Sequence, residues 1–260
     1  MSYLEKQIER LLVEKYEGAE TEGFRADRDR LKAGEPYEYV LGYAIFLDTK
    51  IDLSFKPMIP RPETAFWVKR AIEELKIKKE NLRLADTFSG AGNVGVELLK
   101  NIPNATVDFS ELDPHLKAQI EKNILINNID PGRAKVITAS DIQGLTGKYD
   151  AIFAVPPYVP YEALPDLDPE MIDHEPHLAF FAHDNGHEFH KILIEEAYDL
   201  LNEGGTLYME ADMDHNEAIA EMVKGISWSK LEFWPDPYGA TPNVVLRRGK
   251  RGFLLQRFQK

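Results

Sequence analysis

The chain has 260 residues, of which 43% are hydrophobic and 29% are charged, as in an ordinary globular protein with one sizeable core. It contains no cysteine, which excludes disulfides, thiolate metal sites and a cysteine nucleophile. The net charge of −13 disfavours a nucleic-acid partner, because surfaces that bind phosphates concentrate lysine and arginine. The sequence has no apolar run near the roughly 18 residues that span a bilayer, and its charged start lacks a signal peptide. We therefore expect a cytoplasmic protein with no membrane segment and no direct nucleic-acid contacts.

The first 35 residues predict a short helical segment. Residues 3–16 form an amphipathic pattern whose apolar face consists of Leu4, Ile8, Leu11 and Leu12. A second short helix is expected near 24–33, and Gly34-Glu35-Pro36 ends it.

Residues 36–75 predict a linker between this segment and the rest of the chain. Residues 43–56 alternate as in a hairpin. A helix then begins at Pro62, which suits a first helical position, with Glu63 at its positive end, and runs to about Leu75.

Strand and helix patterns alternate from residue 82 onward, so we assign residues 76–260 to one catalytic domain. Such alternation favours an α/β fold with helices on both faces of a mainly parallel sheet. We expect seven strands, the last of them antiparallel. Strands are predicted over 82–86, 105–110, 135–139, 149–154, 205–211, 229–234 and 252–258, and helices over 93–101, 114–127, 187–201 and 215–224, with an irregular stretch over 155–186.

The one concentration of basic residues comprises Arg247, Arg248, Lys250 and Arg251. We interpret it as a solvated turn between the last two strands, because short charged runs commonly occupy such turns. A local contact with nucleic acid is the alternative.

A glycine-containing turn follows the first predicted strand of this domain. Glycine is needed where φ is positive or where a ligand presses on the backbone. Because ligands of parallel sheets bind beyond the carboxyl ends of the strands, the turn is a candidate cofactor site. Its candidate residues are Asp86, Phe88, Ser89, Gly90, Ala91 and Gly92.

The ends of the next two strands carry acidic residues. Asp113 suits the cap of the following helix, which leaves Glu111 to accept hydrogen bonds from ribose hydroxyls. Asp141 is placed to accept from an adenine amino group, with Ile142 against the ring. A dinucleotide-binding fold would share the glycine turn and the ribose acid. Diphosphate-cradling elements are missing, however, which favours S-adenosylmethionine.

The fourth strand ends in Val155-Pro156-Pro157-Tyr158. This motif resembles the Asn/Asp-Pro-Pro-Tyr of methyltransferases that act on planar amide or amino nitrogens. An amide nitrogen is a poor nucleophile, so it must be oriented by acceptors for its N–H groups while the prolines lock the turn. The resemblance implies a Rossmann-like class I methyltransferase fold, with catalytic positions at Val155, Pro156, Pro157 and Tyr158.

Two further blocks narrow the resemblance. Ile59-Pro60-Arg61-Pro62-Glu63-Thr64 and His174-Glu175-Pro176 are similar to segments of the release factor glutamine N5-methyltransferase family. The resemblance, over about residues 34–250, implies methylation of the glutamine in the Gly-Gly-Gln loop of a peptide-chain release factor by a monomer. S-adenosyl-L-methionine would become S-adenosyl-L-homocysteine. It also implies substrate-binding roles for Arg61, Pro62, Glu63 and Glu175.

Three departures from that family bear on activity. Val155 replaces the motif Asn and cannot accept an N–H hydrogen bond, so we expect impaired turnover. Phe88 is bulky where methyltransferases have Gly or another small residue, and it narrows the methionine end of the pocket. His183 and His187 flank Asp184, a pattern that could bind zinc but that we assign to polar surface, with no metal site expected.

Two other functions remain open on the sequence. An adenine-N6 nucleic-acid methyltransferase shares the Pro-Pro-Tyr chemistry, although the acidic composition and the absence of a recognisable target-recognition domain oppose it. A catalytically inactive or engineered S-adenosylmethionine-binding protein would explain Val155 and the absence of cysteine.

Overall fold

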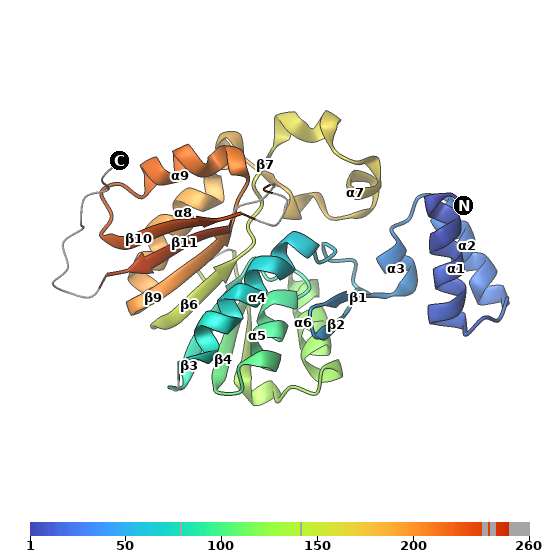
Figure 1. The fold of residues 1–260 in the computed structure, drawn as a ribbon, viewed down its shortest axis with the longest axis horizontal. Coiled ribbons are helices and arrows are strands. Elements are labelled where there is room, and N and C mark those ends of the chain that lie inside the picture. The colour runs from blue at the N-terminus through green and yellow to red at the C-terminus, as the bar shows by residue number, and fades with distance from the viewer. Residues whose placement is uncertain (79, 141, 236–238, 240–242, 250–260) are drawn as a thin grey trace.

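A seven-stranded sheet forms the centre of the computed structural model, which describes the chain except for residues 79, 141, 236–238, 240–242 and 250–260 (Figure 1). The strands are β3 (Leu82–Thr87), β4 (Ala105–Glu111), β5 (Ala134–Thr138), β6 (Tyr149–Ala154), β9 (Leu201–Glu210), β10 (Trp228–Trp234) and β11 (Asn243–Arg248). Their order is β10-β11-β9-β6-β3-β4-β5. Adjacent strands from β5 to β9 pair in parallel, whereas β11 pairs antiparallel with both β9 and β10. The predicted mainly parallel sheet with one antiparallel strand is confirmed.

The last part of the sheet differs from the prediction in position. The strand expected over 252–258 lies outside the described residues and stays a prediction. Among the described strands the antiparallel one is β11, which was not predicted. The interpretation of Arg247 and Arg248 as a turn is therefore wrong. The apolar residues before the arginines pair with both β9 and β10, and the two arginines continue the same strand, β11. Arg247 forms an ion pair with Glu74, its Nη2 lying 2.7 Å from the carboxylate.

Helices cover both faces of the sheet because successive strand side chains point to opposite sides. Phe153 packs into the core beneath α4 (Pro62–Lys76), α5 (Asn93–Asn101) and α6 (Pro114–Ile126). Its neighbour Ile152 packs into the other core, beneath α8 (Glu188–Leu200) and α9 (Asn216–Met222).

The N-terminal segment forms a small separate core beside the sheet domain (Figure 1). It consists of α1 (Tyr3–Tyr16), α2 (Glu22–Lys32) and α3 (Tyr37–Leu41), followed by the hairpin of β1 (Tyr43–Phe46) and β2 (Thr49–Asp52). The two predicted helices and the hairpin are confirmed, and α3 is an addition. The buried carboxylate of Asp27 links α1 and α2 by accepting from Lys15 and Tyr16, each at 2.7 Å.

An arch of short elements replaces the irregular stretch expected after β6, and it passes over the carboxyl end of the sheet (Figure 1). It contains β7 (Val159–Pro160), η2 (Tyr161–Asp166), α7 (Pro169–His174), η3 (His177–Ala179), β8 (Phe181–Ala182) and η4 (Asp184–Gly186). Beyond β9, the short η5 (Met213–His215) leads into α9.

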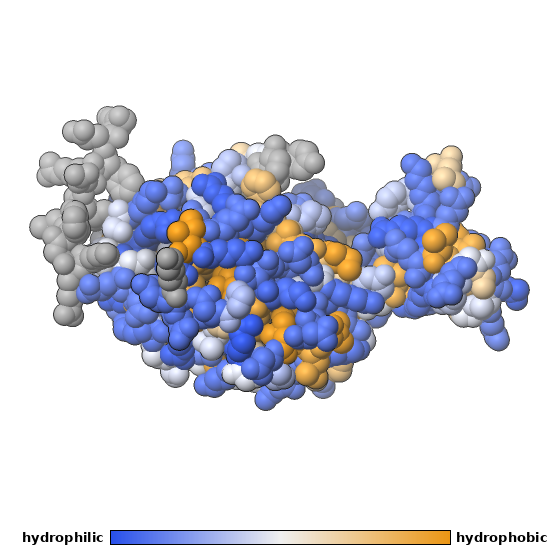
Figure 2. Space-filling view, turned by 60° about the horizontal axis from the view of Figure 1, so that its bottom comes forward, coloured by the Kyte–Doolittle hydropathy of each residue, from blue (hydrophilic) through white to orange (hydrophobic). Residues whose placement is uncertain are grey.

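The surface shown in Figure 2 is mainly hydrophilic, with hydrophobic residues in smaller groups between charged ones. Within the described part of the chain, every helix is too short or too polar to cross a lipid bilayer.

Candidate active site

A cleft opens at the carboxyl ends of β3, β4 and β6, where the strand order reverses direction. It encloses about 1150 Å³, its open mouth included. The glycine turn forms one wall, and the 59–64 segment and the arch form the other. The predicted residues that line it are Arg61, Asp86, Phe88, Ser89, Gly90, Ala91, Glu111, Val155 and Pro157. A ligand bound here would touch the ends of three adjacent strands, which is where ligands of parallel sheets usually bind.

Hydrogen bonds from beneath hold the glycine turn. Asp86 is 1% exposed, and its Oδ2 accepts from the backbone N–H of Gly95 at 2.9 Å. Burial raises the pKa of Asp86 well above its usual range. The Ser89 hydroxyl lies 2.7 Å from the carbonyl oxygen of Asp86 and 3.1 Å from that of Ser110. The turn is therefore fixed by groups that belong to β3 and β4.

Phe88 adopts a backbone conformation that phenylalanine rarely takes. Its φ is +57°, in the left-handed region where a side chain costs about 1–2 kcal/mol relative to glycine. The ring lines the cleft and packs edge-on against Phe189, with centroids 5.2 Å apart. The bulky side chain noted in the sequence thus lies at a backbone position that favours glycine.

Glu111 joins the ends of β3 and β4. Its carboxylate accepts from the backbone N–H of Gly90 at 2.7 Å and from that of Asp113 at 2.8 Å. Each carboxylate oxygen retains acceptor capacity for a ligand hydroxyl. Burial raises the pKa of Glu111, and the two backbone donors oppose that shift. Asp113 caps α6 as predicted, its side chain accepting from His115 N–H at 2.9 Å.

Other predicted cofactor residues lie away from the cleft or outside the described residues. Gly92 has a φ of +78° and faces α6, where an added Cβ would lie 3.1 Å from Ile120. Ile142 is 1% exposed in the core and is not among the described residues that line the cleft. Asp141 lies outside the described residues, although the adjacent Ser140 does line the cleft. Their predicted contacts with a cofactor stay predictions.

A second cavity of about 650 Å³, its open space included, lies beside the first. Its lining residues include Met58, Arg61, Glu63, Val155, Pro156, Tyr158, Ala179 and Glu210. Met58, Arg61, Val155 and Ala179 line both spaces. Val155 is half-buried. Because it lines both cavities, it lies in the wall that they share.

Glu210, the last residue of β9, is a further candidate that was not predicted from the sequence. Its Oε2 accepts from Thr64 Oγ1 at 2.7 Å and from Trp67 Nε1 at 2.8 Å, while Tyr158 donates to Oε1 at 3.3 Å. Burial raises its pKa, and the three donors limit that shift. An acidic residue at a strand end was the available signal, as it was for Glu111.

The proposed substrate residues divide into an ion pair between half-buried Arg61 and buried Glu175, and two exposed residues. Glu175 is 5% exposed and accepts from Arg61 Nη2 at 2.6 Å and from Ile59 N–H at 2.8 Å. Pro62 and Glu63 are exposed at the start of α4, where Pro62 takes the predicted first position. The ion pair connects the arch to the 59–64 segment.

Of the two histidines assigned to polar surface, His183 is exposed as expected, whereas His187 is half-buried. His183 is exposed and its ring lies against Tyr161, with centroids 5.1 Å apart. His187 instead lies beside His190 and His215, two buried histidines that the sequence analysis did not connect.

Solved structures with the same fold are methyltransferases. A methyltransferase from Pyrococcus furiosus superposes with a TM-score of 0.59 at 18% identity, over 86% of this chain and 99% of that one. The hMettl16 catalytic domain, solved in complex with the MAT2A 3'UTR hairpin 1, gives a TM-score of 0.63 at 15% identity, over 80% of this chain and 77% of that one. These similarities establish the Rossmann-like methyltransferase fold.

Sequence relatives are more specific. The chain is 31% identical over 213 residues to the release factor glutamine methyltransferase of Bacteroides thetaiotaomicron, covering 81% of this chain and 75% of the relative. It is 32% identical over 219 residues to the protein of the same name from Bradyrhizobium diazoefficiens, covering 84% and 72%. No protein-family model matches the chain. The extent and identity of these alignments place the chain in the release factor glutamine methyltransferase family.

Proposed function

We propose that this protein binds S-adenosylmethionine in the first cavity and methylates the side-chain N5 of a glutamine that enters the second. The position of Val155 carries the proposal, because it lines both spaces at the end of β6. A methyl donor and an acceptor on either side of this residue would meet at the Pro-Pro-Tyr turn. The names of the relatives support a peptide-chain release factor as the acceptor.

The donor side would use the groups that surround the glycine turn. Glu111 would accept from the ribose hydroxyls, and the turn from Phe88 to Ala91 would face the methionine portion. Asp141 and Ile142 remain the proposed adenine contacts. When bound, S-adenosylmethionine supplies an electrophilic methyl that an amide nitrogen accepts in one in-line displacement, the C–S bond breaking and one N–H proton leaving to solvent.

The acceptor side would orient the amide. The carbonyl oxygen of Pro156 would accept one N–H, and the side chain at position 155 would accept the other if it were asparagine. Valine has no acceptor and adds a branched apolar group at this point. We therefore expect slow methyl transfer, because the lost hydrogen bond is worth about 1–3 kcal/mol, or roughly one to two decades in rate.

The arrangement of the chain suggests how a release factor would be held. We propose residues 1–35 as a helical grip, 36–75 as a linker and 76–260 as the catalytic domain. The Gly-Gly-Gln loop would pass between the arch and the 59–64 segment, near Arg61 and Glu63. A single cytoplasmic copy of the chain would suffice, since both cavities are built from one chain.

A methyl-transfer assay tests the proposal. The full chain and Val155→Asn would be incubated with S-adenosylmethionine and either a release factor or adenine-containing DNA, and the products analysed by mass spectrometry. We expect one methyl group on the Gly-Gly-Gln glutamine, formed faster by Val155→Asn. Methylation of DNA alone would overturn the proposal in favour of the adenine-N6 alternative.

Val155 itself favours a second function, that of an inactive S-adenosylmethionine-binding protein. Calorimetry with S-adenosylhomocysteine separates the two. Binding without transfer by either variant would support the inactive protein, and absence of binding would count against both functions.

A further inference from the structure

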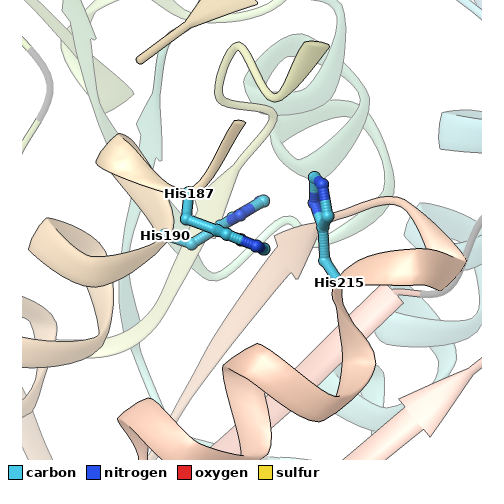
Figure 3. A group of neighbouring side chains, drawn as sticks. All are labelled: His187, His190 and His215. Carbon is cyan, nitrogen blue, oxygen red and sulfur yellow. The ribbon is translucent and has the colours of Figure 1, made fainter. Parts of the chain in front are cut away.

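Three histidine rings meet behind the Pro-Pro-Tyr turn, and none of them lines either cavity (Figure 3). His187 and His190 come from the start of α8, and His215 comes from the end of η5. One nitrogen from each ring lies within 4.8 Å of the others. His190 is 0% exposed and His215 is 7% exposed, so the group is largely removed from solvent.

Hydrogen bonding leaves each ring with a buried nitrogen that has no partner. The Nδ1 atoms of His187, His190 and His215 all lack a hydrogen bond. His190 Nε2 lies 3.1 Å from the carbonyl oxygen of Glu210. A carbonyl only accepts, so Nε2 carries the proton and Nδ1 keeps its lone pair. Buried polar atoms without partners are rare, and three in one place require an explanation.

Two of the rings, those of His190 and His215, are also held towards the neutral form that a metal ligand needs. Burial lowers the pKa of His190 to about 3, with the neighbouring histidines adding to the effect. Burial and His187 likewise lower the pKa of His215. Neutral imidazoles at pH 7 can bind a cation without first losing a proton. A cation would also receive the lone pairs that the fold leaves unused.

We propose that His187, His190 and His215 bind one divalent transition-metal ion, with Zn²⁺ as the reference ion. Imidazole nitrogen binds zinc and other first-row transition metals better than it binds magnesium or calcium. Zn–N bonds of about 2.0–2.1 Å place tetrahedral ligand atoms roughly 3.3 Å apart. The nitrogens, now within 4.8 Å, would reach that spacing by small side-chain rotations.

The position of the group indicates a structural role for the ion. The Tyr158 ring stacks on His190 at 6.3 Å between centroids and meets His215 edge-on at 6.4 Å. Gly186, just before His187, lies so close to Tyr158 that a Cβ there would be 2.2 Å from the Tyr158 carbonyl oxygen. An ion would therefore link α8 and η5 directly behind the Pro-Pro-Tyr turn. Its binding needs neither S-adenosylmethionine nor methyl transfer, so it is independent of the proposed function.

Calorimetric titration tests the site. The full chain, treated with a chelator and dialysed, would be titrated with ZnCl₂ at pH 7, and Co²⁺ would be followed by its visible absorption. We expect one ion per chain and a raised Tm with zinc. His187→Ala and His215→Ala should each weaken binding by about tenfold to a hundredfold or more.

The matched control is His183→Ala, which removes an exposed histidine four residues before His187 and should bind zinc like the parent chain. Circular dichroism in chelator would verify that each variant is folded. If His215→Ala does not fold, His187→Ala decides, because His187 is only half-buried. Absence of saturable zinc binding by the parent chain, or equal binding by folded His187→Ala, would overturn the proposal.

Discussion

Arg61 and Glu175 are 114 residues apart in the sequence, yet the guanidinium lies 2.6 Å from the carboxylate. The second carboxylate oxygen accepts from Ile59 N–H, so a single buried side chain holds two points of the 59–64 segment. The pair forms part of the structure between the two cavities and the arch. We therefore interpret Arg61 and Glu175 as residues that position the segments beside the substrate, and no longer as direct substrate contacts.

Replacing Glu175 should therefore destabilise the protein as well as slow it. Glu175→Ala leaves Arg61 and Ile59 N–H without their acceptor, at a cost of about 1–3 kcal/mol in unfolding free energy. Urea denaturation measures this loss, and assays at varied release-factor concentration should show a higher KM. Glu162→Gln, at an exposed position on the arch, is the control and should change neither quantity. Unchanged stability in Glu175→Ala would contradict the positioning role.

Phe88→Gly should tighten cofactor binding. Glycine tolerates the φ of +57° and also opens the cleft, whereas Phe88→Ala opens the cleft but keeps a Cβ in the left-handed region. We expect both variants to bind S-adenosylhomocysteine more tightly than the parent in calorimetry. In denaturation, the glycine variant should be about 1 kcal/mol more stable than the alanine variant. An alanine variant as stable as the glycine variant would show that a side chain at position 88 does not strain the backbone.

Position 155 offers a test that separates steric bulk from hydrogen bonding. Val155→Asn supplies the missing acceptor and should raise kcat by about 10- to 100-fold with a release factor. Val155→Ala removes bulk without adding an acceptor, and it should recover little of that rate. Equal rates for the two variants would assign the defect to bulk alone.

His190 should make stability depend on pH. Its pKa is about 3 in the folded chain and near 6.5 unfolded, so the unfolded state binds more protons between these values. Its contribution is complete above pH 6.5 and is lost as the pH falls towards 3, at up to about 1.4 kcal/mol per pH unit.

The pH effect is measured as a difference between variants, with chelator present. Burial raises the pKa of Asp86, Glu111 and Glu210, which gives these carboxyls the opposite slope in the same range. His190→Gln keeps an N–H for the Glu210 carbonyl but does not titrate. Unfolding free energies from pH 4 to 7 should rise more steeply for the parent than for this variant. Parallel curves would show that His190 does not titrate as inferred.

Features local to one strand end were predictable. Glu111 ends a strand, and Asp113 and the glycine turn each come directly after one. The chain direction alone brings such ends to one edge of a parallel sheet. The cap at Asp113 was readable because it depends on residues within one turn of helix.

Contacts between distant segments were not predictable. Glu210 owes its role to Thr64, which precedes it by 146 residues, and no periodicity encodes that meeting. The histidine group joins α8 to η5, whereas the sequence pattern had placed His187 together with His183. β11 was not predicted because its apolar run ends in two arginines, and their charge was taken as a sign of a turn although Arg247 has a partner in Glu74.

The position of β11 has a consequence for how the chain is made. β11 occupies an interior place between β9 and β10, although both precede it in the sequence. During synthesis on a ribosome, β10 therefore has no strand to join, among those described, until residues 243–248 have emerged. The five parallel strands can pair with one another before then, so β10 alone of the described strands waits for β11. A chain that stopped after Trp234 would expose one edge of β9 and leave β10 detached.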